Sequence, residues 1–144
     1  MVERLALRLR QAADTAPSNR RLNLIAKAVA AHAALAASDT GTAIRLFEAL
    51  EANARRDSLS FDHFEPLAVE RMTLAELLLA TRQFRRALIV ATVFDHPEPV
   101  SFLAFLPRSL RIREEAADSL GEQQLAAQYR ARLTRLNRAT VPGR

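Results

Sequence analysis

The sequence predicts an all-α fold, an α–α superhelix of six or seven antiparallel helices that stack as hairpins. Composition is the first reason, because alanine, leucine and arginine dominate the 144 residues and only three glycines interrupt them. A recurring phrase is the second: a small or polar turn, then an alanine that opens a helix, with those alanines at Ala43, Ala87 and Ala126. Their intervals of 44 and 39 residues are typical of helical-hairpin repeats, in which each hairpin contacts mainly its neighbours.

The first predicted helix covers residues 2–13 and precedes the repeats. Leu5, Leu9 and Ala12 are spaced by three or four residues and form one apolar stripe. Pro17 then interrupts the helical pattern, because proline has no N–H to donate. We therefore expect an extra N-terminal helix within residues 1–13.

The first hairpin is predicted over residues 20–54. Asn19 is a candidate N-cap for its first helix, which is apolar on nearly every side. A helix of this kind is usually flanked by neighbours on more than one face. In the second helix, residues 42–54, apolar residues recur in steps of three and four. Ala43 lies where a bulky side chain would hold the two helices apart.

Two further hairpins follow. The polar segment 55–66 is predicted to be a longer loop between repeats, and the middle hairpin covers residues 67–94. Pro99 lies just beyond it, where a proline prevents the helix from continuing. The last hairpin is predicted over residues 102–137, with Gly121 as a natural C-cap of its first helix. The apolar run at its start is interpreted as core between hairpins, with an exposed docking patch as the alternative.

Composition indicates one globular domain over residues 1–144, with 49% hydrophobic and 26% charged residues. The sequence contains no cysteine, which excludes disulfides, thiolate metal sites and cysteine nucleophiles. It contains neither a run of about 18 apolar residues nor the apolar core of a signal peptide, so we expect a cytoplasmic protein without a membrane segment. The excess of arginine and alanine is typical of a GC-rich bacterial genome.

The sequence contains no recognisable catalytic constellation. His32, His63 and His96 lack the spacing of zinc ligands. Glu114 and Glu115 are interpreted as partners in ion pairs on a helix surface. Three glycines are too few for a dinucleotide fingerprint or a phosphate-binding loop. We therefore predict a protein that is not an enzyme and has no cofactor and no metal.

Charge is distributed unevenly along the chain, whose net charge is +5. Residues 39–76 hold eight acids against four bases, whereas arginines concentrate in the last third. The cluster consists of Arg108, Arg111, Arg113, Arg130, Arg132, Arg135, Arg138 and Arg144. Ordinary solvated helix faces explain such a cluster, and so does a surface for an acidic peptide or, less often, for a phosphate backbone.

The middle hairpin resembles a tetratricopeptide repeat (TPR). That family places an aromatic residue three positions before the alanine that opens its second helix, which is Phe84 here but Thr40 and Gln123 in the other two hairpins. The matching residues are Leu74, Ala75, Leu78, Phe84, Ala87, Ala91, Phe94 and Pro99. The stretch 105–133 is also similar to the C-terminal ends of bacterial multidomain signalling proteins, in which TPR-like arrays follow a kinase or regulatory ATPase domain.

The resemblance implies a groove lined by the first helix of each hairpin, and therefore a non-enzymatic scaffold that binds a peptide or protein segment. The residues expected to face that groove are Asn23, Lys27, Glu70, Arg71, Arg111 and Glu115. The arginines favour an acidic partner. A regulatory or dimerisation module excised from a larger bacterial kinase or transcriptional regulator is the alternative, which leaves a homodimer open. Arginine-mediated binding of nucleic acid is the third hypothesis.

Overall fold

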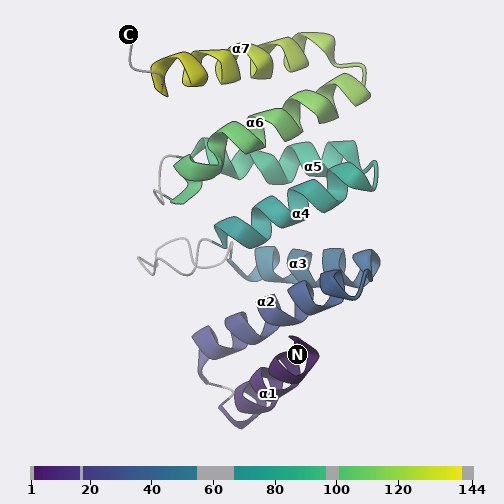
Figure 1. Ribbon diagram of the computed structural model, residues 1–144, viewed down its shortest axis with the longest axis vertical. Helices are drawn as coiled ribbons and strands as arrows, with labels where there is room; N and C mark the ends of the chain where they lie inside the picture. The colour runs from purple at the N-terminus through teal and green to yellow at the C-terminus, as the bar shows by residue number, and fades with distance from the viewer. Residues whose placement is uncertain (1, 17, 55–66, 97–100, 141–144) are drawn as a thin grey trace. The chain divides into compact units, whose positions relative to one another are not determined.

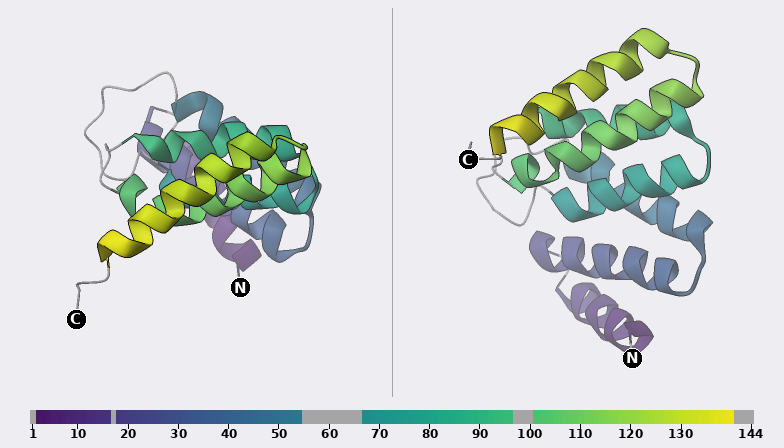
Figure 2. Two further views of the ribbon diagram at one scale, coloured as in Figure 1. Left: turned by 90° about the horizontal axis from the view of Figure 1, so that it is seen from above. Right: turned by 45° about the horizontal axis from the view of Figure 1, so that its top comes forward.

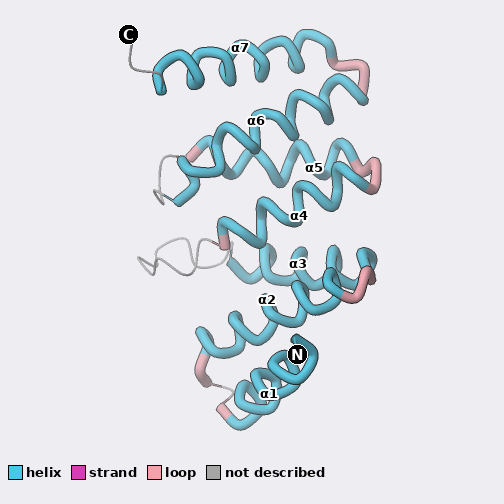
Figure 3. The backbone as a smooth tube through the Cα atoms, viewed as in Figure 1, coloured by secondary structure: helices cyan, strands magenta, loops and turns pink. Residues whose placement is uncertain are grey.

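The computed structural model describes residues 2–16, 18–54, 67–96 and 101–140. Over these residues the chain is all-helical, with seven α-helices, one short 3₁₀ turn and no strand (Figures 1 and 3). The elements are α1 (Val2–Thr15), α2 (Arg20–Ala36), α3 (Thr40–Ala54), α4 (Ala68–Ala80), α5 (Phe84–Ala91), η2 (Thr92–Asp95), α6 (Ser101–Ser119) and α7 (Gln123–Thr140). The predicted all-α class and packed helix pairs are confirmed, and the predicted helix ends lie within three residues of the observed ones.

The chain divides into two compact units, Met1–Ser60 and Phe61–Arg144. The first unit contains α1, α2 and α3, and the second contains α4 to α7. That both act as one domain over residues 1–144 stays a prediction. The predicted loop 55–66, with His63, and the proline exit at Pro99 lie outside the described residues.

In the first unit, α2 packs against both α1 and α3. The side chain of Asn19 accepts a hydrogen bond from the backbone N–H of Leu22 at 3.0 Å, which confirms the predicted N-cap. His32 meets the ring of Phe47 edge-on, with 5.0 Å between centroids. His32 therefore serves as a packing residue between α2 and α3.

The three hairpin turns share one backbone conformation. Ser38, Arg82 and Gly121 each have a positive φ, of 61°, 60° and 77°, and each lies five residues before the alanine in the first turn of the next helix. The next N–H along the chain donates to a carbonyl five residues back, a bond that closes a Schellman motif. These bonds are Asp39 to Ala34, Gln83 to Leu78 and Glu122 to Ala117, at 2.9, 2.8 and 2.9 Å. The recurring phrase in the sequence therefore marks a repeated turn.

The fourth residue of each second helix is an alanine, here called a signature alanine, and all three of these alanines are buried. Ala43, Ala87 and Ala126 are 0%, 0% and 1% exposed. A larger side chain would separate the paired helices, because such interiors are close-packed. The predicted role of Ala43 as a close-contact residue agrees with this burial.

In the second unit, successive helices lie side by side, and α6 contacts both α4 and α5 (Figures 1 and 2). Phe94 is fully buried between the hairpins, with Phe102 at 5.2 Å and Phe105 at 5.8 Å between ring centroids. The interpretation of the apolar run as core therefore holds for Phe102, whereas Leu103 in the same run is 47% exposed. None of the described helices has the length and apolar character needed to cross a membrane.

Candidate partner-binding surfaces

The two predicted groove residues of the first unit both lie on α2. Lys27 is exposed and Asn23 is half-buried. The amide of Asn23 donates to the backbone carbonyl of Asn19 at 3.1 Å, so part of its hydrogen-bonding capacity is used locally. Lys27 is therefore the more available of the two.

Of the two predicted groove residues on α4, Glu70 is half-buried and Arg71 is only 8% exposed. Arg71 lies on the buried side of α4, in register with Ala75 and Leu78 at helical spacing. This corrects the expectation that Arg71 faces a groove: the helix turns its side chain toward the interior. Little of that side chain remains for a partner to contact.

The predicted groove residues on α6 are both exposed. Arg111 and Glu115 lie one turn apart on the same face of the helix. Arg108, one turn earlier on this face, forms an ion pair with Glu76 of α4. This ion pair joins the first helices of two successive hairpins. The structure therefore brings Arg111 and Glu115 to one surface, the α4–α6 face, which also includes Arg108 and Glu76.

Arg113 departs most from expectation, because the sequence places it in the surface cluster and the structure buries it completely. Helix residues turn by about 100° each, so Arg111 and Arg113 point in nearly opposite directions. Arg113 shares the apolar stripe of Leu110 and Ala117, both 0% exposed. That periodicity was the available signal, since an arginine within an apolar stripe needs a buried partner.

The partner of Arg113 is Asp95, the last residue of η2. The guanidinium donates two hydrogen bonds to the carboxylate, at 2.6 Å from Nη1 and 2.9 Å from Nη2. Ser109 accepts from the same guanidinium at its hydroxyl, 3.2 Å, and at its carbonyl, 3.4 Å. The ring of Tyr129 lies 4.9 Å from Cζ. Every side of the buried charge is thus compensated, as such burial requires.

Asp95 is also held from the second helix of the last hairpin. Arg132 of α7 donates to its carboxylate at 2.7 Å. Partial burial raises the pKa of Asp95, but the hydrogen bonds from Arg113 and Arg132 lower that pKa more, to about 2. Asp95 therefore stays ionised across the physiological range. It acts as a structural tie between the end of the middle hairpin and both helices of the last.

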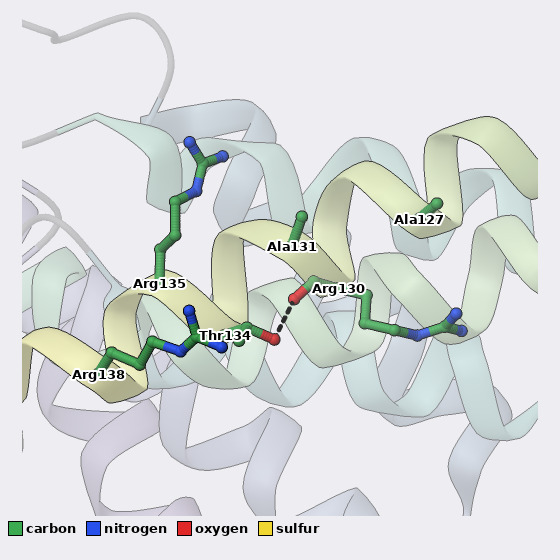
Figure 4. Close-up of a pocket in the computed structure, with 6 residues that line it drawn as sticks. All are labelled: Ala127, Arg130, Ala131, Thr134, Arg135 and Arg138. Carbon is green, nitrogen blue, oxygen red and sulfur yellow. Dashed lines mark hydrogen bonds between the residues drawn. The ribbon is translucent and has the colours of Figure 1, made fainter.

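The outward side of α7 carries a second candidate surface. Its residues are Ala127, Arg130, Ala131, Thr134, Arg135 and Arg138, all of them exposed. They border a shallow depression that is largely open to solvent (Figure 4). We call this surface the α7 face.

The structure divides the predicted basic cluster into paired and unpaired arginines. Arg130 pairs with Glu114 at 2.7 Å and Asp118 at 3.5 Å. The other paired members are Arg108 with Glu76, and Arg113 and Arg132 with Asp95. Within the described residues no ion pair is formed by Arg111, Arg135 or Arg138. Among the described members of the cluster, three arginines are therefore available to a partner, and Arg144 lies outside the described residues.

No group of three or more potential metal ligands occurs in the part of the chain that the structure describes. Comparisons of this chain with protein-family models, with curated proteins and with solved structures found no match.

Proposed function

We propose that this chain is a non-enzymatic interaction module, acting in a bacterial cytoplasm, that binds a protein or peptide segment along the α4–α6 face. One observation supports it above the others: Arg111 and Glu115 stand exposed one turn apart, next to the ion pair between Arg108 and Glu76. The resemblance of the middle hairpin to a TPR supports the same reading, because that family holds peptides against its first helices.

Recognition would combine charge and apolar contact. Arg111 offers a planar fork of donors that fits a carboxylate in bidentate fashion, and Glu115 accepts from a basic side chain or an N–H. Val69 of α4, 52% exposed, adds apolar area to this surface. A bound segment with an acidic and a basic residue at matching spacing would be oriented by this pair.

A charge swap tests the proposal. Peptides that bind the purified protein are selected from an array, and their dissociation constants are measured by fluorescence anisotropy. The variant Arg111→Glu/Glu115→Arg keeps the net charge and leaves opposite charges at i and i+4, so the helix persists. We expect binding to weaken by about tenfold or more, the effect of about 1.4 kcal/mol.

The matched control is Arg10→Asp/Asp14→Arg, a swap with the same spacing between two exposed residues of α1. It should leave the dissociation constants unchanged. Equal affinities of wild type and the α6 swap for every selected peptide would exclude the α4–α6 face as the binding surface.

Self-association is a second candidate, favoured by apolar side chains exposed in the first unit. Leu5 and Leu7 of α1 are 54% and 57% exposed, and Ile25 of α2 is 40% exposed. Sedimentation equilibrium over a range of concentrations measures the mass. A dimer that Leu5→Gln/Leu7→Gln dissociates would support a dimerisation module, and a monomer at all concentrations would exclude it.

A further inference from the structure

The α7 face lies opposite the side by which α7 packs. The buried and half-buried residues Leu125, Ala126, Tyr129, Leu133 and Leu136 form the packing side, in contact with Leu110 and Ala117 of α6. The residues of the α7 face follow at helical spacing on the other side, and none of the described helices covers them. An exposed stripe on this side would ordinarily be polar throughout, yet Ala127 and Ala131 occupy its middle.

The charge of α7 has one sign. Its residues Gln123–Thr140 include four arginines and no acid. Arg132 is held by Asp95, and Arg130 is offset by Glu114 and Asp118. Arg135 and Arg138 remain without a carboxylate partner in the described residues. Two uncompensated positive charges therefore lie toward the C-terminal half of this face.

The shape of the face suits another helix. Figure 4 shows long arginines and small side chains interspersed along this stretch of α7. The small side chains of Ala127, Ala131 and Thr134 leave a hollow into which a partner backbone can approach closely. From Ala127 to Arg138 the face spans about three turns, roughly 16 Å at 1.5 Å per residue.

We propose that the α7 face binds an acidic amphipathic helix of a partner protein. Small or apolar side chains of that helix would pack over Ala127, Ala131 and Thr134. Carboxylates on the flank of the same helix, on successive turns, would accept hydrogen bonds from Arg135 and Arg138. This surface is separate from the α4–α6 face, so either proposal can fail alone.

The same chemistry argues for a helix over nucleic acid. A duplex would contact the arginines through phosphates and leave the alanines without a partner. Ala127 and Ala131 lie where an apolar contact is available and a phosphate gains nothing. The six residues also include no aromatic side chain on which a base could stack.

A designed peptide tests the proposal. The probe is a fluorescein-labelled helical peptide of about 18 residues, with alanine and leucine on one stripe and glutamates beside it at i, i+4 and i+7. Fluorescence anisotropy measures its affinity for the full chain. We expect saturable binding that weakens with salt, and a loss of about tenfold in Arg135→Gln/Arg138→Gln, which removes two charges and keeps the helix. Ala131→Gln, which fills the hollow, should weaken binding about fivefold.

Three controls make the result decisive. Arg8→Gln/Arg10→Gln removes the same charge from exposed positions of α1 and should bind as wild type does. Arg111→Glu/Glu115→Arg should also bind normally, because it alters only the α4–α6 face. A shuffled peptide of the same composition should bind at least tenfold more weakly. Equal binding of the shuffled peptide, tighter binding of a duplex DNA, or unchanged affinity in Arg135→Gln/Arg138→Gln would overturn the proposal.

Discussion

The middle hairpin, α4–α5, and the last hairpin, α6–α7, have the same turn but carry different side chains at equivalent positions. Thirteen residues before the signature alanine, the middle hairpin has Leu74, 1% exposed, and the last has Arg113, 0% exposed. Four residues after it, the middle hairpin has the buried Ala91 and the last has the exposed Arg130. The backbone of the repeat is therefore kept while the contents of equivalent positions change from apolar to ionic.

The difference shows what each position responds to. The turn depends on local backbone hydrogen bonds, so it forms at each of the three places where the same sequence pattern occurs. The side chain at the equivalent of Leu74 depends on its neighbour instead. In the last hairpin that neighbour is Asp95, at the end of η2, and Arg113 pairs with it. Hydrogen bonds fix direction as well as distance, so the last hairpin has a specified orientation on the middle one.

We expect the largest loss of stability from a substitution in the apolar core of the middle hairpin. Leu74→Ala should lower the free energy of unfolding by about 3–4 kcal/mol, because it removes buried methyl groups and leaves a cavity. Urea denaturation measures the loss. A cost below about 1 kcal/mol would mean that the middle hairpin does not provide the main core of the second unit.

The ionic side should be nearly as sensitive. Asp95→Ala leaves Arg113 buried without its carboxylate partner. We expect the free energy of unfolding to fall by about 3 kcal/mol. Arg113→Met on the Asp95→Ala background makes the last hairpin resemble the middle one, and it should recover about half of that loss. Failure to recover any of it in urea denaturation would show that Asp95 stabilises the fold by a route other than Arg113.

Acid should selectively weaken the ion pairs that Asp95 forms with Arg113 and Arg132. The folded-state pKa of Asp95, about 2, lies below its ordinary value of 3.8, so its stabilisation is complete above about pH 4 and is lost as the pH falls toward 2. After allowance for solvent at this carboxylate, the change amounts to about 1–2 kcal/mol. The stability difference between wild type and Asp95→Asn, measured by urea denaturation from pH 7 to pH 2, should narrow over that interval. A constant difference would contradict the assignment.

The smallest effects concern the shared turn. Gly121→Ala should lower the free energy of unfolding by about 1 kcal/mol, because a residue with a side chain is disfavoured at a φ of 77°. A Cβ at this position would meet no atom within 4 Å, so the effect would come from the backbone conformation alone. Arg82→Gly at the equivalent place, φ 60°, should cost little or stabilise slightly. Thermal denaturation of both variants compares the turns. Equal losses of stability in the two variants would contradict the assignment of backbone strain to the positive φ at these turns.

The sequence was sufficient for the helices and turns, because periodicity and turn residues act over a few positions. Gly121 and Ala87 are examples: each was assigned its place from local pattern alone. It was insufficient for Arg113, whose partner Asp95 is eighteen residues away and on another element. Arg71 was misplaced for another reason: the TPR resemblance assigned the first helices to a groove, whereas the helix turns Arg71 inward. The α7 face was only partly foreseen, because the sequence shows the arginines but not which of them are already paired.

The tie at Asp95 bears on how the second unit opens. Among the described helices α7 packs against α6, and a helix with one packed neighbour ordinarily frays by itself. Here α7 cannot leave without Arg132 releasing the same carboxylate that neutralises Arg113 of α6. Opening of α7 therefore also destabilises α6. We expect the amide protons of both helices to exchange with solvent in one cooperative event.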